Sequence, residues 1–343
     1  MPLRRQLGLS AVLAIVVGDM IGSGIFFTPG ELAAVASSEW QVYFFWALCG
    51  VITLCGAHTL AELATMLPRA GVSYHALTQA YGPFAGFMQA WIMILVSGPG
   101  AIAGIAVLFG EFANRMTGGT SEGMQLVWAV AAIVLFAVIN LRGVQWGGRT
   151  QVVLTAVKVV GLIALVVGGL IFADPHSVSS TTAEAAGNGL AGMLQFVGLG
   201  VAIVLFTYDG WIDASNVAGE VKDPGRNFPL AMGAGVILIT VVYLLVNFAF
   251  LRVVPLDEMR AAPTHVAATV ANAAYGNAGG TALNLLMWIS IFGALGGLIM
   301  TLPRLYYAAA SEYVSRAQNT LLAGPVRALA TVSGRHAVPS GAI

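Results

Sequence analysis

Charged side chains are scarce in this sequence. Of its 343 residues, only 9% are Asp, Glu, Lys or Arg, whereas 58% are hydrophobic and the mean hydropathy is +0.85. A soluble domain carries about 25% charged residues. Because so few charges could not cover a water-exposed surface of this size, the composition excludes a soluble enzyme, a soluble nucleic-acid binder and a disordered scaffold. It leaves an integral membrane protein.

The sequence also lacks a surplus of basic residues and has little cysteine. Lys and Arg together number 15, as do Asp and Glu, so no excess positive charge is available to neutralise nucleic-acid phosphates. The two cysteines, Cys49 and Cys55, lie in one apolar run, where we expect small apolar side chains rather than a disulfide or a metal site. We expect no metal and no cofactor.

Signature motifs of membrane enzymes and pumps are absent as well. The sequence contains no His-Glu-x-x-His, Gly-x-Ser-x-Gly or Gly-x-Gly-Asp motif, and no Gly-x-x-x-x-Gly-Lys-[Ser/Thr] phosphate loop. It therefore predicts neither an enzyme nor a pump driven by nucleotide hydrolysis.

Long apolar segments are the dominant feature that is present. A membrane-spanning helix needs about 20 apolar residues, and eight segments qualify, which predicts an all-α membrane protein in a lipid bilayer. These segments cover residues 9–36, 41–67, 84–113, 124–141, 149–173, 190–218, 229–251 and 280–308.

The basic residues indicate the orientation of the chain, because Lys and Arg are enriched in cytoplasmic loops. With the N-terminus inside, eleven of the 15 basic residues fall on the inner side and three on the outer side, while Lys158 lies within a span. We therefore expect a cytoplasmic N-terminus in the inner cell membrane. Two long outer loops follow at 174–189 and 252–279, and we expect the second to contain short helices over the outer mouth.

The first span contains a glycine-rich interruption. Gly22 and Gly24 flank Ser23 at mid-depth, and each glycine weakens a helix by about 1 kcal/mol relative to alanine. An unwound segment there would expose free N–H groups at the start of the next half-helix, where a carboxylate binds favourably. The alternative is that Gly18 and Gly22 form a Gly-x-x-x-Gly face for close helix packing.

The sixth span is interrupted in a similar way. An acid, a glycine and two aromatic residues break its apolar run at Tyr208-Asp209-Gly210-Trp211. The carbonyl groups left free at the end of the first half-helix suit an ammonium group. Glycine-interrupted helices at corresponding places in two halves of a chain are typical of a transporter site. A ligand that places a carboxylate at one break and an ammonium group at the other has the two charged groups of an α-amino acid.

Several acidic and basic residues lie at membrane depth, where charges are costly and often functional. Lys158 either replaces a bound cation, carries a proton, or pairs structurally with carbonyl groups. Asp19 either relays protons or caps the second half of its helix. For Asp209 and Asp213, capping or helix orientation is favoured over direct ligation. Glu220 either pairs with Arg226 or another inner-side base, as part of an inner gate, or ends a solvated helix.

A series of segments resembles the amino acid–polyamine–organocation superfamily, and within it the L-amino-acid transporter-like permeases. The resemblance covers about residues 7–310. In chain order the segments are Gly22-Ser23-Gly24-Ile25-Phe26 with Pro29-Gly30; Pro68-Arg69-Ala70-Gly71 with Tyr74; Tyr81-Gly82-Pro83 to Trp91; Asn140-Leu141-Arg142-Gly143-Val144 with Gln151 and Lys158; and Tyr208-Asp209-Gly210-Trp211 followed by Gly219-Glu220-Val221-Lys222-Asp223-Pro224.

This resemblance implies a five-plus-five inverted-repeat fold with broken helices 1 and 6. The first repeat would be residues 1–173, a partial second repeat 174–309, and a cytoplasmic tail 310–343. Family members usually have twelve spans, so we expect a chain truncated after the eighth span, with an incomplete second repeat: either a fragment or a degenerate product. Val72 stands where the family often has a second glycine.

The resemblance also implies a substrate site and a function. The N–H groups of Ser23, Gly24 and Ile25, freed at Gly22, would bind the substrate carboxylate. Carbonyl groups around Ile21, Phe206 and Thr207 would bind its ammonium group near Gly210. Tyr208 and Trp211 would shape the side-chain end, and Gly98, Gly100 and Ala101 of the third span leave room for a side chain.

Lys158 matches the family lysine that stands where sodium-coupled relatives hold an ion, which disfavours sodium coupling; we assign ion coupling to Lys158 and Asp19. The expected function is secondary active transport of amino acids, by exchange or proton symport. The alternative is an inactive truncated membrane protein. The sequence does not indicate an oligomeric state.

Overall fold

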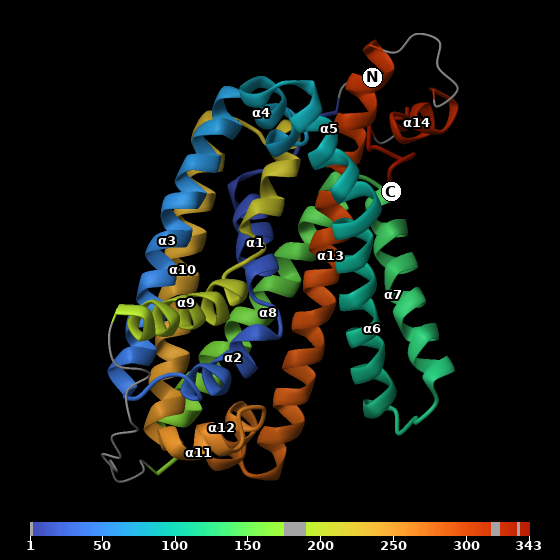
Figure 1. The fold of residues 1–343 in the computed structure, drawn as a ribbon. Coiled ribbons are helices and arrows are strands. Elements are labelled where there is room, and N and C mark those ends of the chain that lie inside the picture. Colours follow the sequence, from blue (N-terminus) through green and yellow to red (C-terminus); the bar gives the residue numbers. More distant parts are fainter. Residues whose placement is uncertain (1–2, 175–189, 317–322, 335–336) are drawn as a thin grey trace.

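The chain folds almost entirely into helices (Figure 1). The computed structural model describes residues 3–174, 190–316, 323–334 and 337–343. Within these ranges, extended pairing is limited to one isolated bridge between Leu7 and Val221. The prediction of an all-α membrane protein is confirmed.

Within the described residues, seven helices are long and apolar enough to cross a membrane, or eight if the bent helix pair at the N-terminus is one span. These helices lie at the positions of the eight predicted spans. The spans are α1 (Leu9–Met20) with α2 (Gly24–Ala33), α3 (Glu39–Met66), α5 (Pro83–Ile92) with the π-helical turn η1 (Met93–Ser97) and α6 (Gly98–Met116), α7 (Glu122–Leu141), α8 (Val144–Ile171), α9 (Leu190–Thr207) with the 3-10 helix η2 (Trp211–Glu220), α10 (Pro224–Val253) and α13 (Asn277–Arg316).

Shorter helices lie at the two ends of the bundle. Figure 1 shows α4 (Val72–Tyr81), α14 (Ala323–Leu329) and both termini at one end, and α11 (Leu256–Ala261) and α12 (Val266–Tyr275) at the other. The short helices expected within residues 252–279 are therefore present. The other outer loop, 174–189, lies almost wholly outside the described residues.

The last span is longer than its apolar run predicts, because α13 continues to Arg316 rather than ending near residue 308. Ala308, Ala309 and Ala310 are buried, and α13 contacts α4 and α5 there. Small side chains let these helices approach closely, and this packing extends the helix past the membrane.

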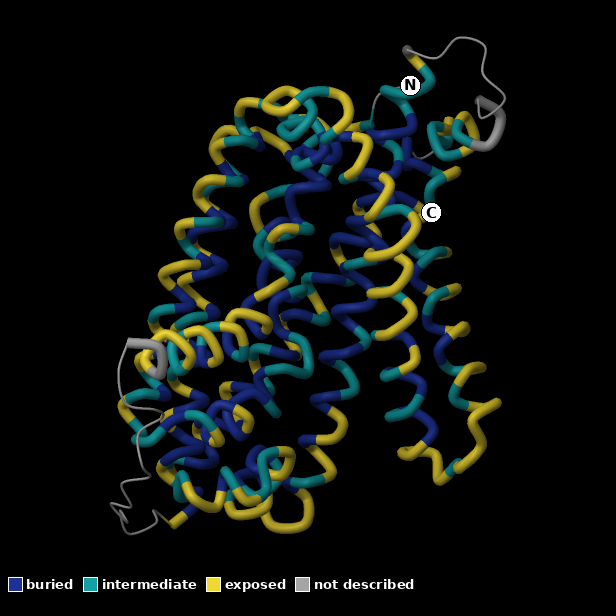
Figure 2. The backbone as a smooth tube through the Cα atoms, in the orientation of Figure 1, coloured by how far each residue is buried: buried dark blue, intermediate teal, exposed yellow. Residues whose placement is uncertain are grey.

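The first helix forms the centre of the bundle. Val12, Ile15 and Val16 of α1 are completely buried, and α1 contacts α8, α10 and α13. By contrast, Val127 and Val130 of α7 are more than half exposed. Figure 2 shows this difference between the buried interior and the exposed rim. Apolar rim residues are expected where a protein faces lipid.

The two interrupted spans lie side by side in opposite directions. The first half of span one, α1, contacts the second half of the other, η2, and α2 contacts α9. Between α2 and α9, Thr28 and Thr207 share a hydrogen bond of 2.6 Å between their hydroxyl groups. The interruptions are thereby brought to the same depth.

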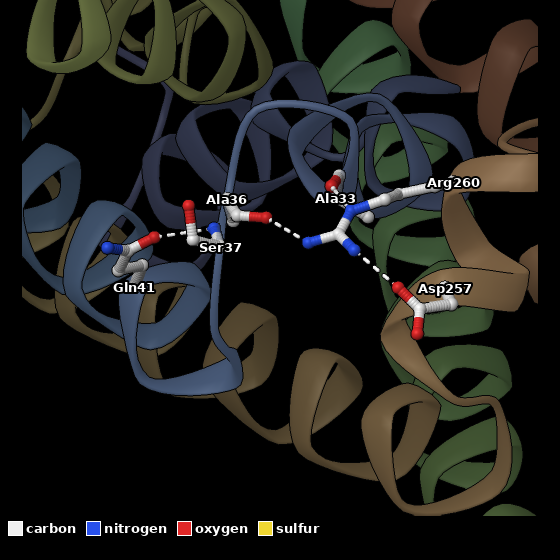
Figure 3. Close-up of polar contacts among 6 residues, drawn as sticks. All are labelled: Ala33, Ala36, Ser37, Gln41, Asp257 and Arg260. Atoms are coloured by element: carbon white, nitrogen blue, oxygen red, sulfur yellow. Dashed lines mark hydrogen bonds and ion pairs between the residues drawn. The ribbon is translucent and has the colours of Figure 1, made fainter. Parts of the chain in front are cut away.

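The C-terminal end of α2 is fixed by the loop helix α11. The Arg260 guanidinium donates hydrogen bonds to the carbonyl oxygens of Ala33 at 2.8 Å and Ala36 at 2.5 Å, and it pairs with Asp257 (Figure 3). Ser37 donates its N–H to Gln41 Oε1 at 2.7 Å and closes the same turn. These contacts satisfy carbonyl groups that a helix end leaves free.

Candidate functional site

The first helix break lies between Met20 and Gly24, where the axis bends by 42°. Within the described residues, the N–H groups of Ser23, Gly24 and Ile25 have no hydrogen-bond acceptor, while Phe26 N–H bonds to Ser23 O. The first N–H groups of a helix have no partner within it and carry its positive dipole end. The predicted break is therefore present and leaves N–H groups free at the start of α2, while their binding of a substrate carboxylate stays a prediction.

The second break lies between Thr207 and Trp211, and it approaches the first one closely. Gly210 has a φ of 110°, and a Cβ atom there would lie 2.6 Å from the carbonyl carbon of Asp19. Only glycine adopts this conformation readily and allows such an approach. The sequence predicts the break at this glycine, but not its contact with α1.

Lys158 fixes the end of α1. Its ammonium group is completely buried and donates hydrogen bonds to the carbonyl oxygens of Gly18 at 2.7 Å and Ile21 at 2.8 Å. A positive charge is favourable at the carbonyl end of a helix. The Ile21 carbonyl, which we expected to receive a substrate ammonium, therefore already accepts one bond from Lys158.

Tyr243 of α10 is a residue that the sequence reasoning missed. Its buried hydroxyl donates to Met20 O at 2.8 Å and lies 3.4 Å from Thr207 O. It therefore bridges the ends of the two first half-helices. A single tyrosine in an apolar span gives no signal of this role, because the contact depends on how α10 packs against α1.

A cavity of about 630 Å³ opens between the two breaks, α6 and α13. Its volume falls in the ordinary range for small-molecule sites. Six of the ten expected substrate residues line it. They are Gly22, Ser23, Gly24, Phe206, Thr207 and Gly210.

The other four expected residues, which include Ile21 and Ile25, lie outside the cavity wall. Tyr208 is buried against Trp46 and Tyr243, and its hydroxyl donates to Trp46 O at 2.9 Å. Trp211 lies beside Gly56 of α3. Both rings therefore face α3, and their expected role at the side-chain end of a substrate stays a prediction.

The opposite wall is formed by small residues of α6. Gly100 and Ala101 line the cavity as expected, together with Gly104. Gly98 instead packs beside the Tyr306 hydroxyl. The π-helical turn Met93–Ser97 lies directly before this wall; such turns are frequent at functional sites.

Three carboxylates also line the cavity: Asp19, Asp209 and Asp213. The two carboxylate oxygens of Asp19 are buried and have no hydrogen-bond partner within the described residues. Asp209 and Asp213 line the cavity, and Asp213 also lies in the first turn of η2, so their expected capping or orienting role stays a prediction.

At the C-terminal end of η2, Glu220 forms a buried ion pair. Its carboxylate accepts a hydrogen bond from Arg304 Nε at 2.7 Å, and the two side chains are 1% and 0% exposed. The partner is therefore an arginine within α13, rather than Arg226. The pair joins η2 to α13.

Comparisons with known proteins show the family of this chain. Residues 7–333 match the family model described as amino acid permease. The serine/threonine exchanger SteT of Bacillus subtilis is 32% identical over 312 residues, covering 90% of this chain and 69% of the exchanger. The b(0,+)-type amino acid transporter 1 of Mus musculus is 31% identical over 316 residues, covering 90% and 63% of the two chains.

The human cystine/glutamate transporter is 27% identical over 314 residues, which cover 90% of this chain and 62% of that protein. The chain thus spans about two thirds of the length of these relatives. Its family match, by contrast, covers nearly all of its own length, including both helix breaks and Lys158. This chain belongs to the amino acid permease family.

Proposed function

We propose that this protein is a secondary transporter that moves α-amino acids across the inner cell membrane, by exchange or proton symport. The observation that carries the proposal is the meeting of two broken helices on one cavity of about 630 Å³. The relatives named above are an exchanger and two transporters of amino acids, which supports the same function.

In this proposal the substrate carboxylate binds the first break. The N–H groups of Ser23, Gly24 and Ile25 are unpaired within the described residues, and the N-terminal end of α2 adds its dipole. Backbone N–H groups recognise any α-amino acid alike, because every such substrate presents the same carboxylate.

The substrate ammonium binds the second break. Phe206 and Thr207 line the cavity and end α9, so their carbonyl groups belong to the negative end of that helix. Ile21 lies outside the cavity wall and its carbonyl oxygen already accepts a bond from Lys158, so the carbonyl groups near Phe206 and Thr207 are the proposed acceptors.

Asp19 and Lys158 are the proposed coupling pair. A Cβ atom at Gly297 of α13 would touch Asp19 Oδ1, and one at Gly293 would lie 2.8 Å from Lys158 Nζ. Asp19 of α1 and Lys158 of α8 thus contact the same face of α13, at positions one helical turn apart. A proton taken up by the Asp19 carboxylate would weaken its attraction to Lys158 and loosen α1 from α8.

The proposed orientation places the N-terminus in the cytoplasm, since basic residues concentrate on that side of the bundle. The division into a first repeat, 1–173, and a partial second repeat, 174–309, is supported by the crosswise contacts of α1 with η2 and of α2 with α9. In an inverted repeat the second copy runs in the opposite direction, so the first half of one broken span lies beside the second half of the other.

The site assignment is tested by valine substitutions at three glycines, with uptake of radiolabelled amino acids into proteoliposomes as the measurement. A Cβ atom at Gly24 would lie 2.9 Å from Thr207 Oγ1, while one at Gly22 would enter open space in the cavity. Gly24→Val and Gly22→Val should each reduce uptake at least tenfold, the first by displacing α9 and the second by filling the site.

The matched control is Gly198→Val, which adds the same side chain to α9 at a position with open space outside the cavity wall. It should retain uptake near the unmodified level. Unchanged uptake in both Gly22→Val and Gly24→Val would refute the placement of the substrate between the breaks.

A further inference from the structure

The two helix breaks account for the α-carboxylate and α-ammonium groups of an amino acid, so the remaining cavity wall must recognise its side chain. That wall consists of α6, α13 and the three carboxylates Asp19, Asp209 and Asp213. Within the described residues, no Lys, Arg or His lines the cavity. The side-chain end of the site is therefore acidic.

One of these three negative charges has a compensating neighbour. Lys158 lies one turn of α13 away from Asp19, as their contacts at Gly293 and Gly297 show. The lysine ammonium is committed to the carbonyl groups of α1, but its charge still acts on Asp19 through space. It cannot also balance Asp209 and Asp213.

The other two carboxylates have no such neighbour. In the described part of the chain, neither Asp209 nor Asp213 forms an ion pair or a side-chain hydrogen bond. Asp213 is half-buried, whereas Asp209 is exposed. A carboxylate at membrane depth is costly without a partner, and its attraction to a cation is stronger where water is partly excluded. Asp213 therefore favours a positive ligand more strongly than Asp209.

The α6 wall leaves room for a long side chain. A Cβ atom at Gly100 or Gly104 would have no neighbouring atom within 4 Å, so both glycines border open space. The apolar residues Ile291, Ala294 and Leu298 of α13 line the cavity and can cover the methylene groups of such a side chain.

We propose that this cavity selects amino acids whose side chain ends in an ammonium or guanidinium group, with Asp213 as the principal counter-ion. The proposal rests on the amino acid transport function proposed above and names the substrate class of that same site. Binding would bring a net positive charge into a cavity that carries uncompensated negative charge.

The test is competition against radiolabelled arginine on the full chain in proteoliposomes, with two pairs of unlabelled competitors. Arginine and citrulline have nearly the same size but differ in charge, as do lysine and norleucine. We expect the charged member of each pair to compete at concentrations at least tenfold lower. A parallel series uses radiolabelled leucine, so that binding of a neutral amino acid is also detected.

The variant Asp213→Asn keeps the shape of the side chain and removes its charge. It should lower the preference for arginine over citrulline at least tenfold while citrulline and leucine still bind. The control Glu122→Gln removes a carboxylate from the exposed start of α7 and should leave the preference unchanged.

The outcomes separate the two proposals. Equal competition by arginine and citrulline, with leucine bound, would overturn the cationic selectivity and leave amino acid transport standing. A preference that persists undiminished in folded Asp213→Asn would overturn the role of Asp213. Failure of every amino acid to bind would overturn the transport function itself. The comparison of competitors on the unmodified chain decides the selectivity even if the variant does not fold.

Discussion

At the scale of single residues, Lys158 and Tyr243 hold the end of α1 in place. The lysine donates to Gly18 O and Ile21 O, and the tyrosine donates to Met20 O. Three carbonyl groups at one helix end are thus bonded from two neighbouring helices. Because unsatisfied carbonyl groups inside a membrane are costly, these contacts maintain the break that presents N–H groups to the cavity.

Replacing Lys158 with Met should therefore destabilise the protein. The apolar side chain has a similar length but leaves two buried carbonyl oxygens unbonded, at a cost of about 1–3 kcal/mol each. The melting temperature in detergent should fall clearly below that of the unmodified chain. Val160→Met, on the exposed face of the same helix, should leave it nearly unchanged. A melting temperature equal in both variants would contradict the assigned role.

His75, on α4 outside the membrane, predicts a dependence of stability on pH. Burial lowers its pKa from the ordinary 6.5, the carboxylate of Glu312 at 3.3 Å opposes this shift, and Arg69 adds to it. Because the folded-state pKa lies below the unfolded one, the unfolded chain takes up a proton first as pH falls. Stability is therefore lost as pH falls below about 6.5.

This dependence is measured by melting temperatures in detergent at pH 7.5 and pH 5.5. The unmodified chain should lose more stability on acidification than His75→Gln, which has no group that titrates at this position. An equal loss in the two proteins would show that His75 makes no contribution.

At the scale of secondary-structure elements, the Glu220–Arg304 ion pair joins the C-terminal end of η2 to α13. Removing one member of a buried pair costs about 3–5 kcal/mol, because the other charge stays buried alone. Glu220→Gln and Arg304→Met should each destabilise the protein by about this amount, as measured by titration with a denaturing detergent.

The double variant should lose less than the sum of the two single losses, because no charge is then left unpaired. Strict additivity of the two losses would show that the side chains do not act as a pair.

The sequence predicts elements better than the contacts between them. Gly22, Gly24 and Gly210 mark the helix breaks because glycine carries a local conformational signal that needs no neighbour. Lys158 is recognisable as a charge inside an apolar run. Three contacts depend instead on helix packing: the bonds of Lys158 to its acceptors, the bridge made by the Tyr243 hydroxyl, and the pairing of Glu220 with Arg304. They join residues 84 to 223 positions apart in the sequence. No local sequence pattern encodes contacts between such distant segments.

The orientation of aromatic side chains shows the same limit. Tyr208 and Trp211 adjoin the second break in sequence, yet both face α3. One residue along an α-helix rotates a side chain by about 100°, and one residue along a 3-10 helix by about 120°, so adjacency to a break does not determine which side chains reach the cavity.

At the scale of the whole molecule, α1 is enclosed by α8, α10 and α13, while α7 exposes apolar side chains at the rim. This arrangement encloses the irregular end of α1 in a protein wall rather than lipid. The cavity between the breaks combines apolar residues of α6 and α13 with three carboxylates.

The central claim is that this cavity carries amino acids across a membrane. It is tested most directly by counterflow with the purified chain in proteoliposomes, loaded with a mixture of unlabelled amino acids that includes arginine and leucine. If the chain exchanges substrates, we predict that labelled amino acid accumulates in the loaded proteoliposomes well above the level in unloaded ones. If it is a symporter, we predict accumulation when an inward proton gradient is imposed. Accumulation no greater than in protein-free liposomes under both conditions would contradict the claim.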